Sequence, residues 1–424
     1  MGILNIKEKV FGLDATQLKF GQQSLNELSW EIKKFKPKII LLVIDPALKK
    51  FNINKKIINQ IKVTKIQYKI YQQIKIEPSL DSLEAASEFA KKNKFDLIIA
   101  VGGGSTIDTA KVINLIKVCK GEVMDYVNQP IGKGKKPNKK LLPLIAIPTT
   151  SGSGSEATTV AVLDIPELKL KTGISHTLLR PSLALVDPEL SKSSPSGVTA
   201  SAGLDVICHA IESYISKPYF LRNKPLTPGD RPPYQGSNPI SDIWSLQAIE
   251  YSGKYFLRSV INAKDLEAKG FMMLSATLAG IGFGSAGVHI PHACAYPIAG
   301  LKHSFRAKGY KTAFVPHGIS VFLTAPASFR FTYSSNPKKH IKAAELLKGS
   351  PIKNPNKESL PKELIRIMKK INTPTGLKDL GYTKKDLPEL ISGSFKQQRL
   401  LALSPKKVQE KDIKNILEQS MKNW

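Results

Sequence analysis

The first half of the chain alternates between short apolar runs and amphipathic segments, and this alternation constrains the fold more than any other feature. "PKIILLVID" (37–45) and "FDLIIAV" (95–101) are apolar runs of strand length, typical of strands buried on both faces of a sheet. "SLDSLEAASEFAKKNK" (79–94) opens with a Ser/Asp cap and carries helical spacing. Further strand patterns lie at 65–74, 141–150 and 182–190. Because parallel strands need helical crossovers, the pattern predicts a doubly wound, Rossmann-like parallel sheet.

Beyond about residue 190 the pattern becomes helical. The expected helices are 198–217, 239–262, 264–284, 339–347, 361–372 and 408–422. A chain of 424 residues is longer than one hydrophobic core usually serves. We therefore expect an α/β N-terminal domain over residues 1–192, followed by an all-α C-terminal domain over residues 193–424.

The chain is strongly basic. Lys and Arg number 63 against 34 Asp and Glu, which gives a formal net charge of +29. The densest basic cluster, "GKGKKPNKK" (132–140), contains no aromatic residue, and no zinc-finger, RRM or helix-turn-helix signature is present. We therefore expect a lysine-rich surface that attracts small acidic molecules, and no nucleic-acid partner. A polyanion-binding protein remains an alternative if the lysines gather on one face.

Residues 271–301 contain no Asp, Glu, Lys or Arg. Glycines and prolines interrupt this stretch, so it predicts a buried helix–turn–helix rather than a membrane span. The chain has three cysteines, too few for a disulfide framework, and its first 21 residues lack a secretory or organellar leader pattern. These features predict a cytoplasmic protein with no membrane partner.

Two loops follow predicted strands and are built from small residues. In "VGGGSTIDTAK" three glycines precede a helix, whose N-terminal N–H groups and dipole suit a phosphate, although a tight turn alone would also explain them. "PTTSGSGSE" (148–156) ends another strand of the same sheet, and two such loops favour a dinucleotide. Asp45 ends an earlier strand, where a carboxylate can accept the ribose hydroxyls of NAD or cap a helix.

"GLDVICHAIESY" places Asp205 and His209 one helical turn apart in an apolar stretch. His292 and His317 also lie in uncharged surroundings, where an unpartnered imidazole is costly. Each histidine alone would be interpreted as a hydrogen-bonded core residue. Together the four side chains offer one oxygen and three nitrogens, a set that suits Fe²⁺ or Zn²⁺ and leaves room for a substrate oxygen.

Five stretches, in this order along the chain, resemble the successive signatures of the iron-containing alcohol dehydrogenase family. They are "GGGSTIDTAK", "PTTSGSGSE", "GLDVICHAIESY", "GFGSAGVHIPHACAYPIAG" and "VPHGIS". The resemblance covers nearly the whole chain. It implies a dehydroquinate synthase-like architecture, in which the α/β domain binds NAD and the helical domain binds metal and substrate.

The resemblance also assigns roles to single residues. The family's metal ligands match Asp205, His209, His292 and His317, with Fe²⁺ expected and Zn²⁺ as the alternative. Its cofactor contacts match Asp45, Gly103, Gly104, Ser105, Asp108, Thr149, Thr150 and Lys171. Many members carry a histidine four residues after the third ligand, where this chain has Tyr296. We expect Tyr296, His289 or the cofactor ribose to handle the proton instead.

Three further stretches resemble the family members that act on hydroxyacids and oxoacids: "DYVNQPIGKGKK", "RPPYQGSNPISDIW" and "LKHSFRAKGYKTAF". The implied reaction moves a hydride from 4-hydroxybutyrate to 2-oxoglutarate through a bound nicotinamide, giving succinate semialdehyde and 2-hydroxyglutarate. Such acidic substrates need cations, and we expect them from Arg222 and Arg231. Tyr234, Gln235 and Asn238 are expected to join the pocket, and the protein is expected to be a homodimer.

Two alternatives keep the fold. In one, the chain is an NAD-dependent alcohol or 4-hydroxybutyrate dehydrogenase that exchanges free NAD at each turnover. In the other, it is a non-redox cyclase or lyase, because such enzymes share a similar architecture and also use NAD and a metal.

Overall fold

The computed structural model describes residues 6–168, 170–192, 194–301 and 304–424. They form two compact units. The sheet unit contains residues 15–195 and 263–277, and the helical unit contains the segment that ends at Asp14, residues 196–262 and residues 278–424. Each unit is treated by itself below.

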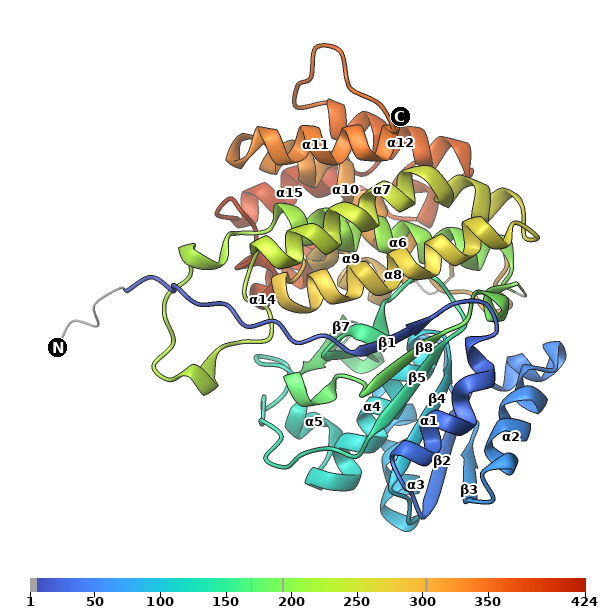
Figure 1. Ribbon diagram of the computed structural model, residues 1–424. Helices are drawn as coiled ribbons and strands as arrows, with labels where there is room; N and C mark the ends of the chain where they lie inside the picture. Colours follow the sequence, from blue (N-terminus) through green and yellow to red (C-terminus); the bar gives the residue numbers. More distant parts are fainter. Residues whose placement is uncertain (1–5, 169, 193, 302–303) are drawn as a thin grey trace. The chain divides into compact units, whose positions relative to one another are not determined.

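The sheet unit is built on six parallel strands in the order β1-β8-β5-β4-β2-β3 (Figure 1). They are β1 (Gln17–Phe20), β2 (Ile39–Ile44), β3 (Gln67–Tyr71), β4 (Leu97–Gly102), β5 (Leu144–Pro148) and β8 (Leu183–Val186). Five strand patterns were recognised in the sequence. They correspond to β2, β3, β4, β5 and β8 of this sheet. An antiparallel hairpin of β6 (Val160–Ile165) and β7 (Leu170–Ser175) stands apart from it. The hairpin and β1 were not predicted from the sequence.

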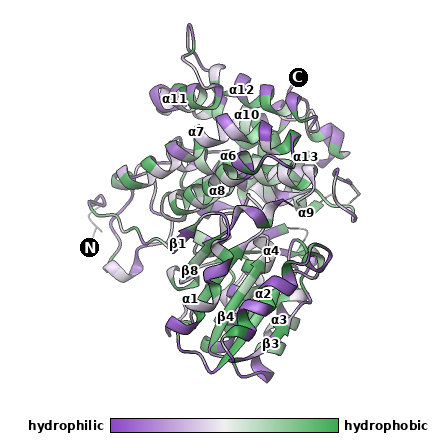
Figure 2. Cartoon of the chain, turned by 45° about the vertical axis from the view of Figure 1, so that its right-hand side comes forward, coloured by the Kyte–Doolittle hydropathy of each residue, from purple (hydrophilic) through white to green (hydrophobic). Residues whose placement is uncertain are grey.

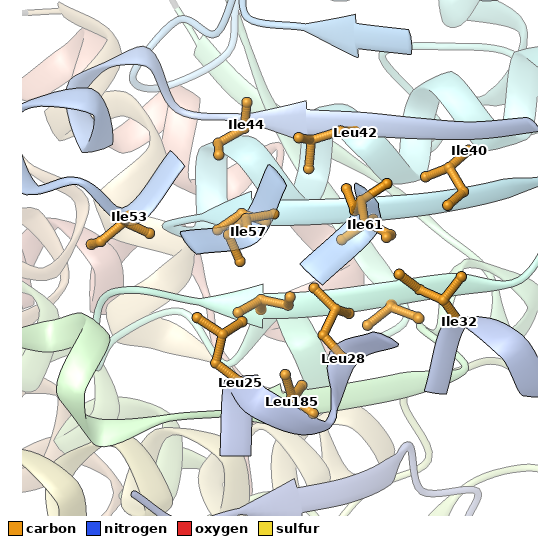
Figure 3. Close-up of a cluster of buried hydrophobic side chains, with 14 of the residues drawn as sticks. Leu25, Leu28, Ile32, Ile40, Leu42, Ile44, Ile53, Ile57, Ile61 and Leu185 are labelled. Carbon is orange, nitrogen blue, oxygen red and sulfur yellow. The ribbon is translucent and has the colours of Figure 1, made fainter. Parts of the chain in front are cut away.

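Helices cover both faces of the sheet. They are α1 (Leu28–Lys34), α2 (Ile53–Val63), α3 (Leu80–Lys92), α4 (Gly104–Cys119) and the short α5 (Val123–Tyr126). Alternate residues of β2 point to opposite faces: Ile40, Leu42 and Ile44 pack with α1 and α2 (Figure 3), whereas Leu41 and Val43 pack with α3 and α4. The predicted doubly wound parallel sheet is therefore confirmed.

The helical unit contains most of the remaining helices. They are α6 (Ser196–Ile215), α7 (Pro239–Ile261), α9 (Ile290–Leu301), α10 (His317–Thr332), α11 (Pro337–Lys348), α12 (Ser359–Lys370), α13 (Leu387–Phe395), α14 (Gln398–Leu401) and α15 (Glu410–Gln419). The helix α8 (Leu266–Ala286) begins in the sheet unit and ends in the helical unit. The central strand β4 is hydrophobic along its length, whereas helices such as α11 mix hydrophobic and hydrophilic residues (Figure 2).

The uncharged stretch 271–301 forms the end of α8 and all of α9, with a turn at Gly287, where φ is 84°. Its residues are almost all buried, as expected for a core helix–turn–helix. No single helix among the described residues is long and apolar enough to cross a membrane. Among these residues, only α8 and α9 taken together have the required length and composition, and the pair is bent by 106°.

Candidate active site

Three loops that carry predicted cofactor residues start from neighbouring strands of the sheet. In the register, Ile44 of β2 pairs with Val101 of β4, and Gly102 of β4 pairs with Pro148 of β5. Asp45 and Thr149 continue this pairing, since their N–H groups donate to Val101 and Gly102 at 3.1 and 3.0 Å. Their loops and the glycine loop therefore leave the carboxyl edge of the sheet together, which is where α/β folds bind ligands.

The glycine loop is packed tightly against the second loop. A Cβ on Gly104 would lie 2.5 Å from Ser153 Oγ, and one on Gly103 would lie 3.2 Å from Thr150 Oγ1. Gly102 has a φ of 159°, a conformation that favours glycine. Gly103 is the N-cap of α4 and its cap has no side-chain hydrogen bond, so the first turn of α4 keeps N–H groups for a phosphate.

Four other predicted cofactor residues have partners within the sheet unit. Asp45 Oδ1 accepts the Ala47 N–H at 2.8 Å and so caps a short 3₁₀ helix, the alternative role considered for it. The Asp108 carboxylate is buried and accepts the Val162 N–H at 3.0 Å. Lys171 pairs with Glu77, whose backbone N–H donates to Ser105 Oγ at 3.1 Å. Sequence reasoning missed Glu77, because it lies in a loop with no motif around it.

The structure brings the four predicted metal ligands together in the helical unit. Asp205 and His209 lie on α6, His292 on α9, and His317 is the first residue of α10. Asp205 Oδ1 lies 3.7 Å from His209 Nε2, 3.5 Å from His292 Nε2 and 3.8 Å from His317 Nε2. Ligands about 2.0–2.2 Å from a tetrahedral ion are about 3.3–3.6 Å apart. A small contraction of the cluster would therefore give a tetrahedral site.

The cluster contains buried polar atoms that lack partners. Asp205 Oδ1 and His292 Nε2 have no hydrogen bond within the part of the chain that the structure describes. Leaving such atoms unpaired in a protein interior is costly. A cation bound among them would satisfy both, so the donor set fits a divalent metal. The His317 side chain is 21% exposed, whereas those of the other three are buried.

The charges of the cluster also favour a cation. Burial by itself raises the pKa of Asp205, but His209, His317 and His292 hold that pKa well below its ordinary value. Burial lowers the pKa of His209 to about 3, against the opposing effect of Asp205. Burial also opposes a proton on His292, yet Glu212 and Asp205 raise its pKa to about 9. The carboxylates that favour a proton on His292 favour a metal cation in its place.

Glu212 is a site residue that sequence reasoning missed. Its carboxylate is fully buried and lies 2.5 Å from His292 Nδ1. The spacing contained a signal, because Asp205, His209 and Glu212 at i, i+4 and i+7 share one face of a helix.

The two candidates for proton handling differ in their surroundings. The Tyr296 ring lies 6.2 Å from the His317 ring, beside the ligand cluster. His289 is fully buried, and neither of its ring nitrogens has a hydrogen-bond partner among the described residues. Burial lowers the pKa of His289 to about 4, so it is neutral near pH 7.

The predicted substrate residues lie on the segment 217–239, and most of them contact other parts of the helical unit. Arg231 Nε pairs with Glu8 Oε2 at 3.2 Å, and Arg222 donates to the Gln235 carbonyl at 3.1 Å. The Gln235 side chain exchanges two hydrogen bonds with the Gly12 backbone, at 2.8 and 2.9 Å. The contacts of Arg231 and Gln235 join segment 217–239 to residues 6–12.

The other two substrate candidates are Asn238, which caps a helix, and Tyr234, which contacts a neighbour of the ligand cluster. Asn238 is the N-cap of α7, where its side chain accepts the Ser241 N–H at 2.9 Å. The Tyr234 ring lies edge-on to Phe283 at 6.5 Å. Phe283 stacks on His209 with ring centroids 4.0 Å apart. Tyr234 is therefore the member of the set that the ring contacts connect to the cluster.

Comparisons with known protein families match both halves of the chain. Residues 15–188 match the family described as "Iron-containing alcohol dehydrogenase", and residues 234–421 match "Fe-containing alcohol dehydrogenase family, C-terminal". The chain belongs to the iron-containing alcohol dehydrogenase family, a family of oxidoreductases.

Relatives with high coverage carry a more specific name. The chain is 41% identical to "Hydroxyacid-oxoacid transhydrogenase, mitochondrial" of Xenopus tropicalis, over 98% of this chain and 91% of that protein. The Homo sapiens protein of the same name is 41% identical over 97% and 90%. Among solved structures, 1,3-propanediol oxidoreductase has a TM-score of 0.84 at 25% identity, over 97% of this chain and 100% of that one.

The comparison overturns one expectation. The transhydrogenases that match nearly the whole chain are named as mitochondrial, so the prediction of a cytoplasmic protein is wrong. A low cysteine count separates reducing from oxidising compartments. It does not separate one reducing compartment from another, and the prediction relied on it together with the lack of the leader pattern expected of an organellar protein.

Proposed function

We propose that this chain is a metal- and NAD-dependent hydroxyacid-oxoacid transhydrogenase. The observation that carries the proposal is the convergence of Asp205 Oδ1 and three imidazole Nε2 atoms within 3.5–3.8 Å of that oxygen. It occurs in a chain 41% identical, over nearly its full length, to proteins of that name. The proposed reaction converts 4-hydroxybutyrate and 2-oxoglutarate into succinate semialdehyde and 2-hydroxyglutarate.

Asp205, His209, His292 and His317 would hold the metal, with Fe²⁺ favoured by the family and Zn²⁺ as the alternative. When bound, the metal supplies a Lewis acid for the substrate oxygen, and the nicotinamide supplies a hydride acceptor and donor. Phe283 and the neighbouring apolar residues keep water from the buried ligands, which strengthens the electrostatic interactions there.

The sheet unit, which contains most of the predicted N-terminal domain of residues 1–192, would bind NAD. The first turn of α4 and the loop of Thr149 and Thr150 would hold the pyrophosphate, since the loop glycines let a phosphate approach the backbone. Asp45 uses one carboxylate oxygen as a cap and has a second for ribose hydroxyls. Lys171, paired with Glu77 beside Ser105, would contact the cofactor from β7. The buried Asp108 would act indirectly by fixing the start of β6 to α4.

The helical unit, which contains most of the predicted C-terminal domain of residues 193–424, would bind substrate. Tyr296 is the better candidate for the proton, because it lies beside the partly exposed His317. His289 is buried and resists protonation. Arg222 and Arg231 would provide cationic charge for the substrate carboxylates, with Tyr234, Gln235 and Asn238 shaping the loop around them. A homodimer stays a prediction, which sedimentation of the purified protein would test.

The test is an assay without added NAD. Purified protein loaded with Fe²⁺ or Zn²⁺ receives 4-hydroxybutyrate and 2-oxoglutarate, and 2-hydroxyglutarate is measured by mass spectrometry. Many turnovers per chain are expected, because the cofactor stays bound and is recycled. The Asp205→Asn variant, which weakens the metal set, is the matched control and should give no product.

Two other outcomes would change the proposal. Product that forms only after NAD is added, together with free NADH, would indicate a dehydrogenase that exchanges its cofactor. No product in either assay, from a protein that contains metal, would leave the family intact and rule out this substrate pair.

A further inference from the structure

Glu212 is a buried carboxylate on the same face of α6 as Asp205 and His209. Glu212 is 0% exposed to solvent. A charge in such a place needs strong partners, because burial of an ionised carboxylate is expensive unless hydrogen bonds compensate it.

Both carboxylate oxygens of Glu212 face the start of α9. Oε1 lies 2.5 Å from His292 Nδ1, and Oε2 accepts the backbone N–H of His289 at 2.6 Å. A carboxylate oxygen can only accept, so Nδ1 of His292 carries the hydrogen of this bond. A bound metal would displace the proton of Nε2, so Nε2 is the nitrogen that would supply the lone pair, and it is the atom that lies 3.5 Å from Asp205 Oδ1.

The candidate ligand His209 is held in place differently. His209 stacks on Phe283 at 4.0 Å with planes 9° apart, and on His292 at 4.5 Å. Its Nδ1 has no hydrogen-bond partner in the described part of the chain. Ring packing orients His209, whereas a carboxylate hydrogen bond orients His292. Loss of Glu212 should therefore act on one ligand only.

We propose that Glu212 is a positioning residue of the metal centre, whose carboxylate fixes the Nδ1–H tautomer and ring orientation of His292 and thereby directs Nε2 at the metal. The proposal rests on the metal site of the proposed function. Carboxylates that orient ligating histidines raise metal affinity, and their loss typically costs about 10- to 100-fold.

The test compares metal binding by Glu212→Ala, Glu212→Gln and the wild-type protein. Zn²⁺ and Co²⁺ affinities are measured by competition with a chromogenic chelator, and the visible spectrum of the Co²⁺ form reports the ligand field. Glu212→Ala should lose about 10- to 100-fold in affinity. Glu212→Gln should lose less, because its amide oxygen can still accept one of the two hydrogens, from His292 Nδ1 or from the His289 N–H. Both should shift the Co²⁺ spectrum.

The matched control is Glu156→Gln, which neutralises another buried carboxylate. Glu156 is 3% exposed and accepts from Thr277 Oγ1 at 2.8 Å within the sheet unit, whereas the four ligands belong to the helical unit. Its metal affinity and Co²⁺ spectrum should match those of the wild type.

A double variant separates positioning from a general loss of stability. If Glu212 acts through His292, then Glu212→Ala should cost little further affinity in a His292→Ala background. Equal affinities and spectra for wild type and Glu212→Ala would overturn the proposal while the metal site stands, even if the melting temperature falls. So would full additivity in the double variant. A wild-type protein that binds no metal would overturn the proposed function and this inference together.

Discussion

Two buried histidines, His340 and His292, differ in a way that supports the metal interpretation. His340 of α11 is buried and has partners for both nitrogens: Asn336 O at 2.8 Å and Thr332 Oγ1 at 2.9 Å. His292 has a partner for Nδ1, but its buried Nε2 has no hydrogen bond among the described residues. A core histidine is normally satisfied as His340 is. The unsatisfied nitrogen of His292 faces other potential ligands instead, as a metal site requires.

The first prediction concerns His340 and acid stability. Burial lowers its pKa from 6.5 to about 4. Between these pH values the unfolded chain binds a proton that the folded chain excludes, so the free energy of unfolding falls as pH drops from about 6.5 to 4. The largest loss is about 3 kcal/mol for this group. His340→Gln keeps a donor and an acceptor but does not titrate. Urea unfolding at several pH values should show a smaller acid loss for the variant.

Other buried histidines titrate in both the wild type and His340→Gln. The contribution of His340 is therefore the difference between the two proteins in the pH dependence of unfolding free energy. Identical pH dependence would mean that His340 is protonated as easily in the folded chain as in the unfolded one.

For single residues, the sequence indicated the candidate metal ligands but not the residue that hydrogen-bonds to one of them. Asp205 and His209 were found because their spacing on one helix is visible in the sequence. Glu212 was missed, since its partner His292 is 80 residues away and only the tertiary fold brings them together. Asp108 was assigned to the cofactor, yet its side chain turns inward to Val162 of β6, a strand that was not predicted.

At the scale of elements, the strongly apolar strands were predictable and the weaker ones were not. β2 and β4 are almost wholly buried, so each reads as a continuous apolar run. β1 is an edge strand of four residues, none fully buried, and shows no such run. α10 was missed because Pro326 lies inside it, and an internal proline normally argues against a helix.

The second prediction tests the close packing of the two cofactor loops. Gly104→Ala places a methyl group 2.5 Å from Ser153 Oγ and 2.9 Å from its Cβ, so the loops must move apart. NAD affinity should fall at least tenfold, as measured by fluorescence titration. Gly270→Ala is the control, because its Cβ would meet Pro188 at an ordinary 3.4 Å. Unchanged NAD affinity in Gly104→Ala would show that this loop does not bind the cofactor.

The third prediction concerns the contact between residues 6–12 and segment 217–239. Glu8 is buried, accepts the N–H groups of Lys9 and Val10 at 3.0 Å, and pairs with Arg231. Arg231→Ala leaves this carboxylate without its cation, which should cost about 1–3 kcal/mol of unfolding free energy. Glu8→Gln should cost less, and the two changes together should cost less than their sum. Denaturant unfolding of the four proteins measures this coupling.

Lys7→Ala is the control for that cycle, since the Lys7 side chain donates an exposed hydrogen bond to Asn223 Oδ1 at 3.1 Å and its loss should change stability little. If the two substitutions are additive, the pair does not hold the segments together. Arg231 would then be available to a substrate carboxylate.

The molecule as a whole carries an excess of cationic residues, but its sequence contains no recognised nucleic-acid-binding motif. The charge of +29 arises from 63 basic residues against 34 acidic ones. The outer field is therefore positive, and a positive field accelerates the encounter with small anions.

The fourth prediction follows from that field. Raising NaCl screens long-range attraction, because the Debye length falls from about 10 Å at 0.1 M to 3 Å at 1 M. The kcat/KM for dianionic 2-oxoglutarate should therefore fall several-fold between low and high salt. A monoanionic 2-oxoacid should show about half the slope on a logarithmic scale, since the attraction scales with substrate charge. Equal slopes for both acids would mean that salt acts on the protein itself. A slope close to zero for the dianion would show that the lysine-rich surface does not steer the substrate.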